Sequence, residues 1–149
     1  MKQTWRIACL VFGIDQLTKA LVIMRLAPGE SHPLLPSLIS LTHVQNTGAA
    51  FGLFKGRQFF FIGLSLVVMA WLVWELRTHR SMAPILRWGS ALILGGAAGN
   101  LIDRVRHGSV TDFIDLHVWP VFNLGDSAIT IGVTLLILHS LVKRGTGDT

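Results

Sequence analysis

Two aspartates, Asp112 and Asp126, are the side chains of this sequence best suited to carry out a reaction, because both are flanked by small or hydroxyl-bearing residues. Two carboxylates brought close together cannot both ionise easily, so they share a proton and titrate as a pair. The ionised carboxylate can then activate a water molecule while the protonated one polarises a carbonyl group. That is the chemistry of an aspartic protease, and it requires neither a metal nor a cofactor.

Other catalytic patterns are absent from the sequence. It contains no Gly-x-Ser-x-Gly elbow for a serine nucleophile and no Walker-type phosphate loop. The six histidines show neither His-x-x-x-His nor His-Glu-x-x-His spacing, so we expect no zinc site. The single cysteine, Cys9, excludes an internal disulfide bond and a cysteine-based metal cluster.

Several other polar residues have simple structural explanations beside a functional one. Asp15 and Lys19 are four residues apart, so they would share one helical face and could form an ion pair. Asn123 and Asp126 could cap a final helix, with Asp126 as its N-cap. These alternatives stay open at the level of the sequence.

Structural alternatives also stay open for the polar residues between positions 103 and 117. Asp103 and Arg104 are adjacent, so on a helix they point about 100° apart and need not pair with each other. Arg104 could instead bind an external anionic group, such as a lipid phosphate or a carboxylate. Asp115 and His117 fit a plain surface loop.

The composition indicates an integral membrane protein. Of its 149 residues, 51% are hydrophobic and only 14% are charged, whereas soluble domains average about 25% charged residues. The length fits a single domain, which we take as residues 1–149. The formal net charge of +5 is better explained by membrane topology than by nucleic-acid binding, so no nucleic-acid partner is expected.

Four segments can form membrane-spanning helices. The first follows Lys2 and Arg6, and because no Ala-x-Ala cleavage site comes after it, we interpret it as a retained helix. Three further runs lack any charged residue: 58–74, 88–102 and 127–142. A bilayer core of about 30 Å needs roughly 20 helical residues. We therefore expect an all-α membrane protein with spans at about 5–25, 58–75, 88–104 and 124–142.

Lysine and arginine are concentrated on one side of this arrangement. The N-terminus, the 75–87 loop and the C-terminal tail carry seven of them in 26 residues, whereas 25–57 and 103–126 carry five in 57. The positive-inside rule then places both termini in the cytoplasm and the polar motifs outside. An aromatic belt is expected on the cytoplasmic side from Trp5, Trp71, Trp74 and Trp88.

The external segments are expected to form a small β-sheet on the membrane surface. Three prolines prevent a continuous helix at the start of segment 27–57. Residues 39–42 alternate like a short strand, and residues 109–118 form a second strand-like segment in the other external loop.

Simple depth arithmetic places two polar residues in the outer half of the membrane. Asp126 lies 17 residues before Lys143, about 25 Å along a helix, and Asn100 lies 13 residues after Arg87, about 20 Å. Polar and ionisable groups at such depth usually face a protein interior or a wet cavity, which makes both of them functional candidates.

Five motifs resemble, in order, the signature blocks of bacterial lipoprotein signal peptidase, signal peptidase II. They are Asp15-Gln16-x-Thr18-Lys19, Asn46-Thr47-Gly48-Ala49-Ala50-Phe51, Gly99-Asn100-x-x-Asp103-Arg104, Val110-x-Asp112-Phe113 and Phe122-Asn123-x-x-Asp126-Ser127-Ala128-Ile129. The resemblance spans nearly the whole chain. It implies an aspartyl endopeptidase of the bacterial inner membrane that cuts a diacylglyceryl-modified prolipoprotein just before the lipidated lipobox cysteine. The site would face the extracytoplasmic side.

The resemblance also implies residue roles, carried over by position. Asp112 and Asp126 would be the catalytic pair. The residues lining the site would be Asn46, Gly48, Asn100, Arg104 and Asn123. Supporting residues would be Asp15, Lys19 and Asp103. A monomer in contact with membrane phospholipid, a cradle-like sheet from segment 27–57 and inhibition by the cyclic peptide globomycin are further expectations.

Two glycine positions bear on this resemblance. Gly95 and Gly99 are spaced as in small-xxx-small helix packing, and we expect them to bring helices close and to leave room for an entering peptide. Gly125 stands where the family often has alanine, which could loosen the turn before Asp126 without removing a functional group.

Three rival functions predict different features. A small proton-coupled transporter would place polar groups at the membrane midplane and usually shows an internal repeat, which this chain lacks. A non-catalytic assembly factor would use the glycine-rich face and survive loss of either aspartate. A presenilin-like protease would need a Gly-x-Gly-Asp motif, but Asn123 replaces its first glycine, and the spans are too few.

Overall fold

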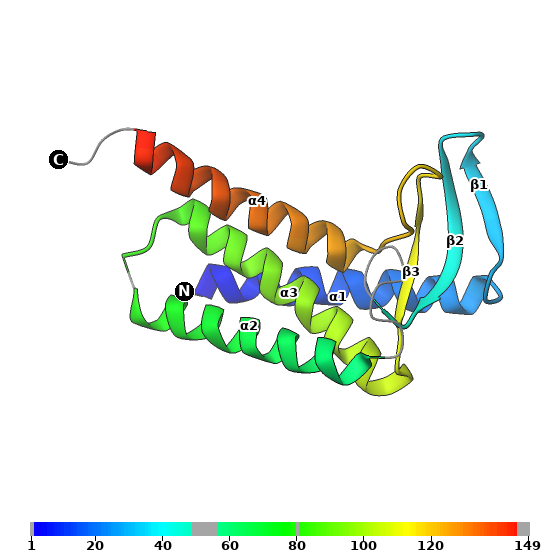
Figure 1. The fold of residues 1–149 in the computed structure, drawn as a ribbon, viewed down its shortest axis with the longest axis horizontal. Helices are drawn as coiled ribbons and strands as arrows, with labels where there is room; N and C mark the ends of the chain where they lie inside the picture. The colour runs from blue at the N-terminus through cyan, green and yellow to red at the C-terminus, as the bar shows by residue number, and fades with distance from the viewer. Residues whose placement is uncertain (1, 49–56, 80, 146–149) are drawn as a thin grey trace.

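The computed structural model describes residues 2–48, 57–79 and 81–145, which form a bundle of helices with a small sheet at one end (Figure 1). The elements follow in the order α1 (Lys2–Arg25), β1 (Ser31–Leu35), β2 (Ile39–Asn46), α2 (Gln58–Thr78), α3 (Pro84–His107), β3 (Val110–Asp115) and α4 (Leu124–Gly145).

All four helices are long and apolar enough to cross a membrane, which confirms the four expected spans. Helices α2, α3 and α4 each end three residues later than the expected spans. The extra turns carry basic side chains such as Arg77 and Arg106, which interact favourably with the carbonyl groups at a helix C-terminus. Charged residues at an interface can therefore prolong a helix beyond its apolar run.

Helix α3 forms the centre of the bundle and packs against α1, α2 and α4. Within its apolar window 56% of the residues are buried in protein, compared with 22% or less in the other three helices, whose large apolar side chains remain exposed for lipid. Glycines allow this packing: a Cβ on Gly89 would lie 2.8 Å from the carbonyl oxygen of Gly132 on α4. Small residues thus determine how closely α3 and α4 approach.

The sheet is antiparallel with strand order β1-β2-β3 and closes one end of the bundle (Figure 1). Its pairing joins distant parts of the sequence, with Asn46 opposite Val110 and Val44 opposite Asp112. Phe113 packs with Val22 of α1 and with Leu26, which directly follows α1, in a small apolar core beneath the sheet. This core fixes β3 over the helices.

The strands confirm the expected sheet but differ in their limits. β2 continues to Asn46, beyond the alternating residues 39–42. β3 ends at Asp115 rather than near residue 118, because Asp115 Oδ1 accepts the backbone N–H of His117, which has a positive φ of 61°. β1, which contains Pro33, was not among the expected strands. Proline is tolerated there because β1 is an edge strand.

The first turn of α1 and the last turn of α4 lie at the end of the bundle away from the sheet (Figure 1). Both ends of the described chain therefore lie at the end of the bundle opposite the sheet. The same figure shows that α3 runs diagonally between its neighbours and ends beneath β3.

Candidate active site

Asp112 and Asp126 come from different elements and meet at one cavity. Asp112 lies in β3 and is only 1% exposed, whereas Asp126 lies in the first turn of α4. Both line a cavity of about 280 Å³ between the sheet and the ends of α3 and α4. The sequence separation of 14 positions is bridged by a loop that turns back through the pairing of Ile114 with Phe122.

Two asparagine side chains hold the carboxylate of Asp112. Asn123 Nδ2 donates to Asp112 Oδ1 at 2.6 Å, and Asn46 Nδ2 donates to Asp112 Oδ2 at 2.8 Å. The backbone N–H of Gly48 donates to Asn46 Oδ1 at 2.9 Å and so fixes which end of that amide faces the carboxylate. Burial, and next the charge of Asp126, raise the pKa of Asp112 to about 7, although both amides oppose the shift.

Asp126 is held by the start of its own helix and by α3. Asn100 Nδ2 donates to Asp126 Oδ1 at 2.8 Å, and the backbone N–H of Asn123 donates to Asp126 Oδ2 at 3.3 Å. In return Asn123 Oδ1 accepts the backbone N–H of Asp126 at 2.8 Å. This reciprocal pair is a capping box in which Asn123 is the N-cap, so the expectation that Asp126 is the N-cap is wrong. Asp126 sits one turn later, with its carboxylate at the cavity.

Behind the pair lies a buried ion cluster formed by Lys19, Asp15 and Asp103, which are each 3% exposed or less. Lys19 Nζ lies 2.8 Å from Asp15 Oδ2 and 3.0 Å from Asp103 Oδ2. Asp15 Oδ1 also accepts the backbone N–H of Gly125 at 2.8 Å, which ties α1 to the start of α4. The expected pairing of Asp15 with Lys19 is present, within a larger network.

The space beside Gly95 and Gly99 of α3 is occupied by atoms of a neighbouring helix. A Cβ on Gly95 would meet the carbonyl oxygen of Ala8 at 2.6 Å, and a Cβ on Gly99 would collide with the carboxylate of Asp15. The space beside them therefore belongs to α1. They bring helices close, as expected, but the expectation that they leave room for an entering peptide is wrong.

Gly125 is also tightly surrounded. A Cβ there would lie 3.0 Å from Asn123 Oδ1, from Asp15 Oδ1 and from the carbonyl oxygen of Gly96. Three oxygen atoms at this distance would press on a methyl group. Glycine at this position therefore fits a tight turn, not the loosened one that its departure from the family pattern suggested.

Arg104 lines the cavity together with the two aspartates. Its guanidinium carbon lies 5.0 Å from the centre of the Phe61 ring, which is a cation–π arrangement. Within the described parts of the chain, Arg104 makes no ion pair closer than 4.0 Å, including with its neighbour Asp103. Its N–H groups thus remain available to a ligand in the cavity.

The structure places the candidate residues in two layers. Asn46, Gly48 and Arg104 line the cavity with the aspartates. Asn100 and Asn123 are 5% and 0% exposed and lie behind the carboxylates, which they orient. The rest of the motif that begins at Asn46, namely Ala49-Ala50-Phe51, lies outside the described residues.

Sequence reasoning gave no role to several residues that complete the site. Gln16 Nε2 donates to Asp103 Oδ1 at 3.0 Å and to the carbonyl oxygen of Gly99 at 3.3 Å. The signal was present, because Gln16 is three residues before Lys19 and shares its helical face. Phe61, which lies against Arg104, gave no such signal, since nothing distinguishes it from other apolar residues of its helix.

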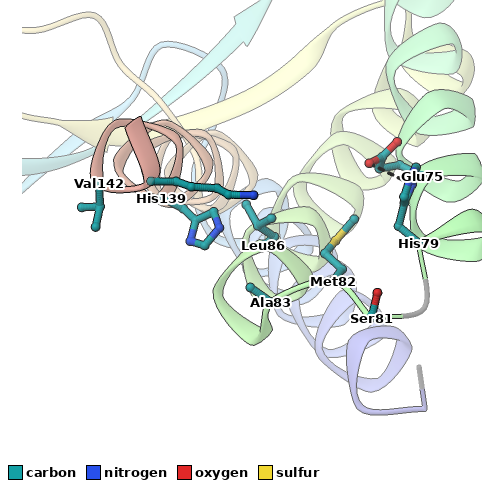
Figure 2. Close-up of a pocket in the computed structure, with 9 residues that line it drawn as sticks. Glu75, His79, Ser81, Met82, Ala83, Leu86, His139 and Val142 are labelled. Carbon is teal, nitrogen blue, oxygen red and sulfur yellow. Dashed lines mark ion pairs between the residues drawn. The ribbon is translucent and has the colours of Figure 1, made fainter. Parts of the chain in front are cut away.

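A larger cavity of about 630 Å³ lies at the other end of the bundle and is a different site. Figure 2 shows Glu75 and His79 on one side and His139 on the other, with Met82 and Leu86 between them. None of the candidate residues lines it. Across the residues that the structure describes, no group of three or more histidine, cysteine or acidic side chains could hold a metal ion.

Four membrane-length helices and an amide-held pair of carboxylates define a multi-pass membrane protein with a paired-carboxylate site. The family model described as "Signal peptidase (SPase) II" matches residues 7–142. The chain belongs to this family, and by class it is a protease.

Individual relatives agree with this assignment. A lipoprotein signal peptidase from Halothermothrix orenii is 43% identical, with 95% of this chain and 97% of the relative covered. Another, from Moorella thermoacetica, is 45% identical over 93% of each chain. A solved structure described as a bacterial membrane enzyme is 32% identical and superposes with a TM-score of 0.94 over 99% of this chain and 93% of its own.

Proposed function

We propose that this protein is an aspartic-type endopeptidase that removes the signal peptide from diacylglyceryl-modified prolipoproteins, cutting immediately before the lipidated lipobox cysteine. The observation that carries the proposal is the meeting of Asp112 and Asp126 at one cavity, each held by asparagine amides. The relatives named lipoprotein signal peptidase support the substrate class.

In this mechanism the two carboxylates share one proton and work without a metal or other cofactor. The ionised carboxylate takes a proton from water as the water oxygen bonds to the scissile carbonyl carbon. The protonated carboxyl gives its proton to the carbonyl oxygen. As the resulting diol collapses, the C–N bond breaks, the amine takes a proton from the first carboxyl, and a hydroxyl proton returns to the second. A chelator is therefore expected to leave activity unchanged.

The position of the site suits a lipidated substrate. Asp126 lies in the first turn of α4 at the sheet end of the bundle, near one membrane surface. Acyl chains attached to a cysteine stay in the bilayer, so the bond beside that cysteine must be cut near headgroup level. We place this surface on the extracytoplasmic side of the bacterial inner membrane, with both termini in the cytoplasm, because basic residues are denser at the other end.

Two further elements of the proposal concern partners. The single chain, residues 1–149, acts as a monomer in contact with membrane phospholipid, and the sheet serves as a cradle for the substrate. Globomycin, as a cyclic peptide inhibitor, would compete for the cavity beside Arg104 and Asp112.

The test compares two forms of one prolipoprotein, with and without the diacylglyceryl group, incubated with purified wild-type protein in lipid vesicles. Mass spectrometry of the product gives the cleavage site. We expect cleavage of the lipidated form only, with the modified cysteine as the new N-terminus, in buffer with or without EDTA. Equal cleavage of both forms, or cleavage at another bond, would reject the proposed substrate.

A further inference from the structure

The ammonium group of Lys19 uses all three of its N–H donors inside the protein. Two lie against the carboxylates of Asp15 and Asp103, at 2.8 Å and 3.0 Å. The third points to Asn100 Oδ1 at 2.8 Å. A buried ammonium needs a partner for each N–H, and the partner of the third joins the ion cluster to Asn100.

The contact with Lys19 fixes the orientation of the Asn100 amide. An ammonium group can donate but cannot accept, so it must face the oxygen of the amide. Asn123 Nδ2 also donates to that oxygen, at 3.2 Å. The NH₂ group of Asn100 is therefore turned toward Asp126, where it donates to Oδ1 at 2.8 Å. Lys19 thus ensures that Asp126 accepts a hydrogen bond from the NH₂ group of Asn100.

The two aspartates differ in their connection to this buried cation. Asp126 is separated from Lys19 by one amide, that of Asn100. Asp112 is separated from it by two, because Asn123 lies between Asp112 and Asn100. A negative charge on Asp126 is therefore the better stabilised of the two.

We propose that Lys19 is a positioning residue of the reaction, which through Asn100 holds the negative charge of the pair on Asp126 and leaves the shared proton on Asp112. This inference rests on the proposed function of the two aspartates and divides the roles between them. The raised pKa of Asp112, about 7, agrees with a proton on that residue at neutral pH.

The roles in the reaction follow from this placement. Asp126 takes the proton from water as the water oxygen attacks the scissile carbonyl carbon, and Asp112 gives its proton to the carbonyl oxygen. When the C–N bond breaks, Asp126 returns its proton to the leaving amine, and Asp112 recovers one from the diol. Lys19 gains and loses no proton.

Other charged groups also act on the pair. Arg104, from α3, faces both aspartates across the cavity. Asp15 on α1 and Asp103 on α3 carry negative charge but lie against Lys19. On β2, the ring of His43 is hydrogen-bonded to the carbonyl oxygen of Leu26 and to the side chain of Gln45, and the residue is buried at 3% exposure.

The test is the pH dependence of kcat/KM for a diacylglyceryl-modified prolipoprotein. In Lys19→Met, loss of the cation makes the singly ionised pair harder to form, so the acid limb of the profile is expected to move up by about 1 pH unit. Asp103→Asn keeps Lys19 and removes an anion, so its acid limb should move down. Arg77→Met changes an exposed cation on α2 and should leave the limb in place.

Asn100→Leu separates the positioning role from the stability of the ion cluster. It leaves Lys19 paired with both carboxylates and removes the amide that joins Lys19 and Asn123 to Asp126. We expect kcat/KM to fall roughly 10- to 100-fold, as for a lost hydrogen bond to a charged group, with an upward shift of the acid limb. A uniform loss of activity at every pH, with the limb unmoved, would overturn the inference even if Lys19→Met fails to fold.

A second measurement does not depend on turnover. The infrared absorption of protonated carboxyl groups, followed against pH in folded protein, reports the titration of the pair directly. The band should persist to higher pH in Asn100→Leu than in wild type, and it should be lost from the neutral range in Asp112→Asn. If the wild type fails to cut the substrate but these infrared shifts appear, the proposed function fails while the placement of the charge on Asp126 and the proton on Asp112 stands. Unchanged bands would overturn that role.

Discussion

The side chain of Asn123 donates a 2.6 Å hydrogen bond to Asp112, so the residue that caps the start of α4 also holds the carboxylate of β3. Its oxygen caps the helix at the same time by accepting the backbone N–H of Asp126. One amide thereby connects both aspartates. Its two functions can be separated by substitution.

Asn123→Ser is expected to keep the cap and lose the bond to Asp112, because a serine hydroxyl can accept from the helix but is too short to reach the carboxylate. We predict a fall in kcat/KM of roughly 10- to 100-fold with little change in thermal unfolding. Asn123→Ala should show the same loss of activity and, in addition, lose about 1 kcal/mol of stability with the cap. Equal stability of the two variants would argue against the capping role.

Asp112 should make the protein less stable as the pH rises through the acidic range. Its pKa is about 7 in the folded protein, against an ordinary value of 3.8. Between these values the folded state binds more protons than the unfolded state, so the free energy of unfolding falls as pH increases. The full effect is roughly 4 kcal/mol, at 1.36 kcal/mol per pKa unit.

Thermal unfolding in detergent would check this dependence. It is measured at about pH 4.5 and about pH 7.5, which lie roughly within and above this window. The decrease in stability should be smaller in Asp112→Asn than in wild type. Asp115→Asn is a matched control on the same strand, because the backbone N–H of His117 lowers the pKa of Asp115 and moves its titration out of this range. If all three proteins lose stability equally, Asp112 is not the group responsible.

Gly99→Ala should damage folding rather than cleavage alone. The added Cβ would collide with the carboxylate of Asp15, and so disturb the contact between α1 and α3. Gly13→Ala is the control, since no atom lies within 4 Å of a Cβ there, and alanine favours a helix by up to about 1 kcal/mol. The yield of folded protein and its melting temperature should fall for Gly99→Ala only. Normal folding with selective loss of cleavage would restore the idea that Gly99 makes room for a peptide.

Arg104→Lys is expected to lower kcat/KM by roughly 10-fold, because lysine cannot reproduce a planar guanidinium stacked on Phe61. Arg106→Lys changes an exposed residue two positions later on the same helix and should leave activity within about twofold. The comparison uses steady-state kinetics with the lipidated substrate. Near wild-type activity of Arg104→Lys as well would show that only the positive charge at position 104 matters, and not the planar guanidinium.

The sequence could predict the helices because charge-free runs and bilayer thickness together restrict their positions. It could not predict β1, since Pro33 argues against a strand unless one knows that the strand lies at an edge. It showed that Gly95 and Gly99 pack closely but not what fills the space beside them. That information depends on tertiary contacts.

The site illustrates the same limit. Residue types and motif order indicated Asp112 and Asp126, but the hydrogen bonds that orient them join residues far apart in the chain, such as Asn46 with Asp112. The start of the last helix agrees with the expected span, but its N-cap could not be chosen from sequence, because both Asn123 and Asp126 are good N-cap residues and only the backbone shows which one is used.

The most direct test of the two-carboxylate mechanism is cleavage of a diacylglyceryl-modified prolipoprotein by purified, folded wild-type, Asp112→Asn and Asp126→Asn proteins. Asp115→Asn, on the same strand as Asp112, is the matched control. We predict that each of the first two variants loses at least about 10³-fold in kcat, while Asp115→Asn cuts at nearly the wild-type rate. Near wild-type cleavage by either Asp112→Asn or Asp126→Asn would contradict the mechanism.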